Sequence, residues 1–453
     1  MNISSRRSFI KNSLATGLAF TGLQRCLAAP ESRIISPYGD LLPDPKGILD
    51  LPKGFEYQIL SQQGTLMDDG LKVPGLPDGM AAFPGKKGRV ILVRNHELTM
   101  NYKAYGPFPK EYKPSENLIS KAYNANSLES ISPGGTTNIV YNPKTKRVEK
   151  QFLSLIGTDL NCAGGAMPWG AWITCEEPAD LISERGRNHG YCFEVKASED
   201  GMLQKAVPLK ALGRFCHEAV ALDPKSGILY LTEDVGDGLL YRFIPDKAND
   251  LGSGKLQALA ITDNPHADLR NWDNKKTSLS IGDSAKVKWI DLQDIDAPYN
   301  DLRLRGHKAG AAIFARGEGI IYADKHIYIC CTNGGPNLQG QIFKLTPGQS
   351  EGVDDQLQLF LQPAHSDLLT NGDNICNTPW GDLIICEDLT QPYINNDTFI
   401  RGITPEGKIY TIARNAINNG EFAGSCFSPD GQTMFVNIQA SGLTLAITGP
   451  WQS

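Results

Sequence analysis

The stretch GRFCHEAVALDPKSGILYLTED, residues 213–234, decides the fold because it predicts a β-hairpin with acids at its open end. Two short apolar runs flank DPKSG, whose Pro, Ser and Gly are typical of a turn. Glu218 and Asp234 are centred on Ser226 inside this turn, so they lie side by side when the two runs pair as antiparallel strands. A carboxylate pair is therefore expected at the end of the hairpin opposite its turn.

The same pattern occurs six times along the chain, each time with a polar opening, an apolar run, a turn, a second apolar run and a closing acid or amide. Repeated hairpins of this kind are typical of β-propeller blades. We therefore predict an all-β fold, a six-bladed β-propeller with long inserted connections, formed by residues 30–453 as a single domain. The six segments are 81–97, 162–177, 217–234, 317–333, 373–388 and 423–437.

Composition is that of an ordinary globular protein, with 41% hydrophobic and 21% charged residues and a formal net charge of −6. No run rich in Lys or Arg is present, so the sequence has no nucleic-acid-binding footprint.

The first residues predict an export signal. Arg6 and Arg7 form a twin arginine, followed by the modestly apolar SLATGLAFTGL and by CLAAP, which suits a signal peptidase. We expect a Tat signal peptide over residues 1–29, the Tat translocation machinery as a partner and a periplasmic or secreted location. The apolar run is too short for a permanent membrane span. An ordinary first helix after a basic N-terminus is the alternative.

In a propeller the open ends of the inner hairpins converge near the axis, which collects many carboxylates in one place. Such a group repels itself unless cations lie within it. Oxygen ligands favour Ca²⁺, whereas a thiolate attracts a softer transition metal. Cys162 is the candidate thiolate, although a buried structural thiol is its alternative. The hairpin ends also make Glu97, Asp234 and Asn437 candidate ligands.

The motifs RNHE (94–97), NCAGGAMPWGAWITCEE (161–177), FARGEG (314–319) and PWGDLIICED (379–388) carry a family resemblance. In these motifs the chain resembles the PhoX family of secreted, Tat-exported alkaline phosphatases. The resemblance implies a six-bladed propeller that hydrolyses phosphate esters, monoesters first and diesters as a second class, with iron and calcium as cofactors.

The resemblance also implies roles for individual residues. Cys162 is expected to bind iron, and Arg316 is expected to contact the substrate phosphate. The expected iron or calcium ligands are Glu177, Glu218, Glu318, Asp373 and Glu387. Arg214 is a second candidate phosphate clamp, with a structural salt bridge as the alternative. Because neighbours on a strand point to opposite sides, only one member of Glu176–Glu177, Glu233–Asp234 and Glu387–Asp388 is expected to face the metals.

Two other classes of function fit a metal-binding propeller: a calcium-dependent hydrolase such as a lactonase, and a non-catalytic binding protein whose metals are structural. The long connections 98–135 and 245–312 exceed what a blade needs, and form either a rim or lid of the site or surface decoration.

Overall fold

The computed structural model describes residues 36–123, 125–177, 188–273, 277–348, 353–388 and 397–452. The expected signal peptide, residues 1–29, lies outside these described residues. Within them no helix has the length and apolar character needed to cross a membrane.

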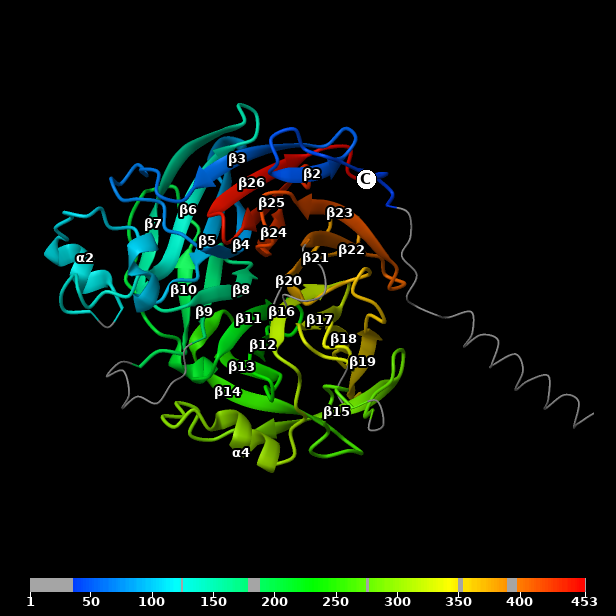
Figure 1. The fold of residues 1–453 in the computed structure, drawn as a ribbon. Helices are drawn as coiled ribbons and strands as arrows, with labels where there is room; N and C mark the ends of the chain where they lie inside the picture. Colours follow the sequence, from blue (N-terminus) through cyan, green and yellow to red (C-terminus); the bar gives the residue numbers. More distant parts are fainter. Residues whose placement is uncertain are drawn as a thin grey trace, which may run out of the picture.

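The chain is all-β, and its sheets stand around a common axis in a propeller-like arrangement (Figure 1). Two antiparallel sheets follow each other first. One contains β4 (Pro77–Pro84), β5 (Val90–His96), β6 (Gly134–Asn142) and β7 (Arg147–Thr158). The next contains β8 (Asn161–Met167), β9 (Ala171–Glu176) and β10 (Cys192–Lys196).

A nine-stranded sheet follows, because β15 (Ser284–Asp291) pairs with β14 on one side and β19 on the other. Its first half contains β11 (His217–Leu222), β12 (Leu229–Glu233), β13 (Tyr241–Lys247) and β14 (Asp250–Ile261). Its second half contains β16 (Gly317–Ala323), β17 (His326–Cys331), β18 (Gln341–Thr346) and β19 (Asp355–Leu361). The inserted connection 245–312 thus supplies part of β13, together with β14 and β15.

The last two sheets join the ends of the chain. β20 (Gly372–Asn377), β21 (Leu383–Glu387), β22 (Phe399–Ile403) and β23 (Ile409–Asn415) are extended by β2 (Leu49–Pro52) and β1 (Leu41–Leu42). β24 (Phe422–Phe427), β25 (Thr433–Ile438) and β26 (Leu443–Thr448) pair with the N-terminal β3 (Glu56–Gln62). This last pairing closes the ring between the two ends of the described chain.

The described helices are short and lie in the connections. They are α2 (Glu116–Lys121), α4 (Leu302–Lys308) and the 3₁₀ turns η1 (Lys86–Gly88), η2 (Met100–Tyr105) and η3 (Lys210–Leu212).

The first strands of the six hairpins, β4, β8, β11, β16, β20 and β24, touch one another in this order around the axis, and β24 returns to β4. Apolar side chains fill the spaces between successive sheets, as Val93 and Phe193 do between the first two. Tyr230 and Ile327 pack in the same way between the two halves of the nine-stranded sheet. The core is therefore divided among the interfaces between neighbouring hairpins, and their first strands surround the axis.

Candidate metal centre

All six hairpins carry the same irregularity at their open ends. The first strand pairs normally for one residue, or for two in the sixth hairpin, and then two of its residues stand opposite a single residue before pairing resumes. A bulge of this kind re-aims side chains, often beside an active site. The first bulged residue is, in chain order, Asp78, Cys162, Glu218, Glu318, Asp373 and Gly424. Five of the six equivalent positions therefore carry a metal-ligating side chain.

These bulged side chains meet near the axis. Glu218, Glu318 and Asp373 each offer a ligand atom within 4.8 Å of the others, and so do Cys162, Glu177 and Glu218. Glu218 belongs to both groups and joins them into one cluster. The structure thus brings together five side chains that the sequence singled out, from four different hairpins.

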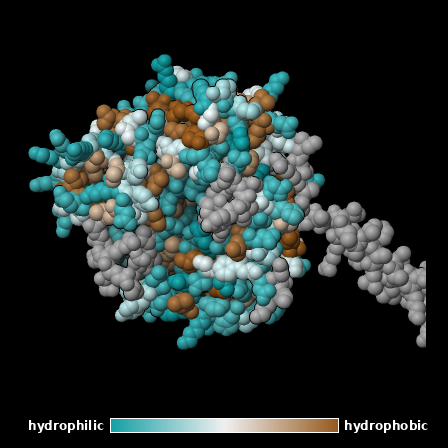
Figure 2. Space-filling model, viewed as in Figure 1, coloured by the Kyte–Doolittle hydropathy of each residue, from teal (hydrophilic) through white to brown (hydrophobic). Residues whose placement is uncertain are grey.

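A second set of positions follows the second strand of each hairpin. In every case its backbone N–H donates to the carbonyl of a residue just before the first strand, over 2.9–3.3 Å. These exit residues are Glu97, Glu177, Asp234, Thr332, Asp388 and Gln439. Because the bond repeats in all six hairpins, it places each exit residue on the same face of the ring, beside the bulges. Figure 2, viewed like Figure 1, shows a hollow near the centre of the ring with hydrophilic residues in it.

A third group of acids lies beside the cluster. Asp78, Glu97 and Glu421 offer ligand atoms within 4.8 Å of one another. The Gln439 amide donates to both Asp78 (2.8 Å) and Glu97 (2.6 Å). Glu97 was expected here, whereas the sequence reasoning missed Asp78 and Glu421.

The electrostatics of this ring demand positive charge. Burial and the neighbouring Asp373 raise the pKa of Glu97 to about 8, and burial and Asp388 raise the pKa of Asp373 to about 7. Burial, followed by neighbouring carboxylates, also raises the pKa of Glu218 and Glu318. The donor set of carboxylates and one thiol therefore fits bound cations, which would hold these groups ionised.

Arg316 supplies a cation within this group of acids. Its Nε lies 2.7 Å from Asp234 and its Nη2 lies 2.7 Å from Glu318, and these two acids raise its pKa. Its backbone is left-handed, with φ of 50°, a strained conformation that is common at functional sites. The expected position of Arg316 and of Asp234 at the site agrees with this geometry.

Two expected ligands point away from the cluster, and one register explains both. Glu387 pairs with Gly372, and Asn437 pairs with Ala423, so each stands opposite the residue just before the bulge and neither occupies the exit position. The Glu387 carboxylate binds Arg401 at 2.8 Å. Asn437 donates to the Asp78 carbonyl and accepts from Thr444, both at 2.6 Å. These contacts correct the expectation of metal ligation, since both side chains hold the fold together behind the site.

The Glu387 position supports a prediction that separates stability from activity. Glu387→Gln leaves the Arg401 guanidinium, 3% exposed, without its counter-charge. Breaking such a buried pair typically costs about 3–5 kcal/mol of unfolding free energy. We expect a clear loss of thermal stability with unchanged metal content and activity per folded molecule. Calorimetry, elemental analysis and hydrolysis assays check this, and loss of metal at unchanged stability would contradict it.

Arg214 contacts backbone carbonyls of two loops. Its side chain is buried, and its Nε donates to the His189 carbonyl (2.7 Å) while its Nη1 donates to the Ala297 carbonyl (3.0 Å). The neighbouring Glu176 accepts from the backbone N–H of Gly190, which follows His189. Arg214 therefore braces the backbone at His189 and Ala297, and its role as a phosphate clamp stays a prediction.

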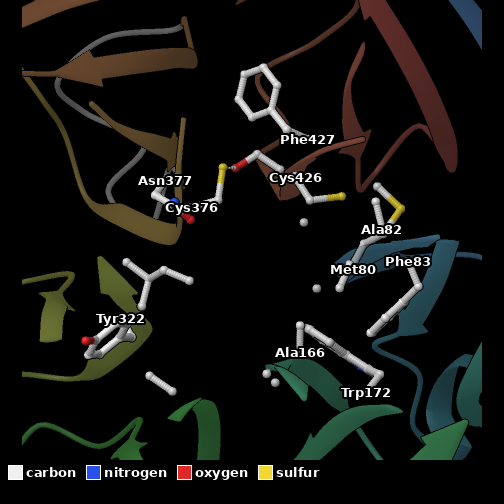
Figure 3. A pocket seen from close by; sticks show the side chains of 18 of the residues that line it. Met80, Ala82, Phe83, Ala166, Trp172, Tyr322, Cys376, Asn377, Cys426 and Phe427 are labelled. Atoms are coloured by element: carbon white, nitrogen blue, oxygen red, sulfur yellow. Dashed lines mark hydrogen bonds between the residues drawn. The ribbon is translucent and has the colours of Figure 1, made fainter. Parts of the chain in front are cut away.

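A large cavity occupies the other half of the axial channel. It has a volume of about 810 Å³ and begins just below the bulges, at residues such as Gly79 and Ala163. Figure 3 shows the apolar side chains that line it, among them Met80, Trp172 and Phe427. It reaches the hairpin turns, and Asp430 is the one carboxylate in its lining. The carboxylate cluster and this cavity thus lie at opposite ends of the same channel.

A propeller-like ring with buried carboxylates and a thiol at its axis defines the class of metal-binding propeller proteins. The family model for alkaline phosphatase PhoX matches residues 36–442, and the chain belongs to this family. Its members are metal-dependent hydrolases of phosphate esters, and this chain is one of them. No curated protein matches the chain.

Two solved structures are similar to the chain. Pseudomonas fluorescens PhoX in complex with vanadate, a transition state analogue, shares 19% identity with a TM-score of 0.63, over 90% of this chain and 97% of that one. The gluconolactonase XC5397 from Xanthomonas campestris shares 8% identity with a TM-score of 0.42, over 92% and 99% of the two chains. The first likeness agrees with the propeller-like arrangement described above.

Proposed function

We propose that this chain is a phosphate monoesterase whose metals are iron and calcium, held by the ring of bulged and exit residues. The proposal depends on one observation: Glu218 belongs to two groups of potential metal ligands. One group contains Cys162 and Glu177, and the other contains Glu318 and Asp373. Phosphate diesters are a second substrate class of the same site.

The assignment of metals follows from the chemistry of the donors. The thiolate of Cys162, with Glu177 and Glu218, suits iron because sulfur favours softer transition metals. The all-oxygen groups suit calcium: one is Glu218, Glu318 and Asp373, the other Asp78, Glu97 and Glu421. Asp234 and Asp388 stand at exit positions beside these groups.

Bound metal ions supply positive charge for the phosphoryl oxygens and make a water a better nucleophile. The chain's own contribution is orientation and charge. Arg316 is the residue to hold the phosphoryl group, because its guanidinium already stands among the acids of the site and can donate several hydrogen bonds to oxygens. Asp234 and Glu318 fix the direction of that guanidinium. The buried walls limit the access of bulk water.

The repeated bulge and the repeated exit bond support a count of six blades, with residues 30–453 as one domain. The nine-stranded sheet is then two blades bridged by β15. The twin arginine supports a Tat signal over residues 1–29 and export to the periplasm or beyond.

Elemental analysis of protein purified after export, combined with ester assays, tests this proposal. We expect iron and calcium in the protein and hydrolysis of 4-nitrophenyl phosphate, with slower hydrolysis of bis(4-nitrophenyl) phosphate. A calcium chelator should abolish both reactions, and added calcium should restore them. Full activity in protein that contains neither metal would contradict the assignment.

A further inference from the structure

Trp272 stands at the rim of the site, on the inserted connection 245–312. Its indole Nε1 donates to the Asn333 carbonyl at 2.8 Å. The Arg270 guanidinium lies 4.2 Å from its ring centroid, and that guanidinium in turn donates to the Gly236 carbonyl at 3.1 Å. A β-carbon added to Gly236 would come within 3.4 Å of the far edge of the indole. Trp272 therefore spans the two loops that contain Gly236 and Asn333.

The same two loops flank Arg316. The Arg316 N–H donates to the Val235 carbonyl (3.0 Å), and the Arg316 carbonyl accepts from the Thr332 N–H (3.1 Å). Val235 and Thr332 immediately precede Gly236 and Asn333. On both loops the indole therefore contacts the residue that follows the hydrogen-bond partner of Arg316. It lies at the outer edge of the sector of the ring formed by these two loops and Arg316.

The exit position of this sector carries no charge. Among the exit positions, Thr332 and Gln439 alone carry no charge, and Arg316 lies directly before the hairpin that Thr332 closes. The Thr332 hydroxyl is buried and has no hydrogen-bond partner. A phosphoryl dianion experiences less repulsion beside the uncharged Thr332 than beside an acidic exit residue, and Arg316 supplies positive charge next to it, between Asp234 and Glu318.

The indole itself remains 38% exposed, although its one polar atom is satisfied. An exposed aromatic face that is fixed on two loops loses little conformational entropy when a flat apolar group packs on it. An ester whose phosphoryl group lies at Arg316 extends its organic group outward, toward this rim.

We propose that Trp272 is a specificity-determining residue that packs against the organic group of the substrate and favours phosphate esters of flat, aromatic alcohols. This inference rests on the proposed phosphatase function and names the substrate class of that site. The inserted connection 245–312 then acts as part of the substrate rim.

Paired esters test the role of Trp272. In Trp272→Ala we expect kcat/KM for 4-nitrophenyl phosphate to fall about tenfold, mainly through KM, and kcat/KM for methyl phosphate to change by less than about twofold. Trp272→Phe should retain most of the preference because it keeps an aromatic face. Calorimetric binding of phenylphosphonate and methylphosphonate, which are not hydrolysed, should show the same contrast.

Trp289 offers a matched control. The Arg242 guanidinium lies 4.4 Å from its ring centroid, and its indole N–H donates a hydrogen bond to Asp355 at 2.7 Å. Unlike Trp272, it lies on β15 in the sheet. Trp289→Ala should leave the ratio of the two esters unchanged. Metal content and thermal unfolding of each variant establish that the site is intact.

An equal loss for both esters in Trp272→Ala, or no loss for either, would overturn the inference. Because the ratio is internal to each preparation, a partly folded variant still gives a decisive value. If metal-loaded wild-type protein hydrolysed neither ester, the proposed function would fail, and the two phosphonate affinities alone would decide the role of Trp272.

Discussion

Glu218→Gln is expected to abolish phosphate ester hydrolysis, with a loss in kcat/KM of about a thousandfold or more. Glu218 is the one side chain common to the group with Cys162 and the group with Glu318 and Asp373. Glutamine keeps the shape of the side chain but removes a negative charge and one strong ligand oxygen from both groups. The reason for the loss is therefore failure to hold the metals in place, and elemental analysis should show reduced iron and calcium.

The fold of the Glu218→Gln variant should survive this change. In metal-free protein the pKa of Glu218 is raised by burial and by Glu177, so the native carboxyl is already driven toward its neutral form. A neutral amide then costs the apoprotein little stability. Glu387→Gln is the matched comparison, since it should lose stability and keep activity. Hydrolysis at the wild-type rate by Glu218→Gln would show that the cluster is not the active centre.

The hairpins and their convergence were accessible from sequence, because a turn fixes which residues are neighbours across two strands. Centring residue pairs on the turn correctly placed Glu218 and Asp234 at one open end of their hairpin. This method did not predict the bulge in the first strand. In each hairpin two residues of the first strand stand opposite one residue of the second, and this one extra residue shifts the partner of each ligand. In the fifth hairpin this shift gives the exit position to Asp388 and leaves Glu387 in the last pair, against Arg401.

The starting points of the first and sixth hairpins explain which acids were missed. The first repeat was expected to begin at residue 81, but β4 begins at Pro77, so Asp78 lay outside the compared segment. Aligning the first four segments on the small residue after each ligand, which is Gly79, Ala163, Ala219 or Gly319, would have found it. Glu421 has a weaker signal in the sequence. Two paired residues, Phe422 and Ala423, separate it from the bulge at Gly424, whereas each other hairpin has one residue there, so Glu421 does not align with the other repeats.

Removing the metals should make the stability of the protein strongly dependent on pH. In the metal-free fold, burial and neighbouring acids raise the pKa of Glu97 to about 8 and of Asp373 to about 7. In the unfolded chain such groups titrate near pH 4. The folded state therefore binds more protons between these values, so its stability is full below about pH 4 and falls as pH rises through the folded pKa values.

Each such group lowers the unfolding free energy by up to about 1.4 kcal/mol per pH unit within this window. Because several acids of the ring act together, we expect the melting temperature in excess chelator to fall by about 10 °C or more between pH 5 and pH 8. Added calcium should remove most of this slope, since a bound cation favours the ionised carboxylates that the apoprotein must keep protonated.

Glu97→Gln tests whether the pH dependence of stability comes from the acids of the ring. The variant removes one titrating acid, so the pH slope of its metal-free melting temperature should be shallower than that of the wild type. Glu56→Gln, on the exposed edge of β3 and away from the axis, is the control and should leave the slope unchanged. Equal melting temperatures of the metal-free wild type at pH 5 and pH 8 would mean that the acids are not packed closely enough to require cations. The physical basis of the metal centre would then be lost, because mutual repulsion among buried carboxylates is what makes bound metals necessary in this ring.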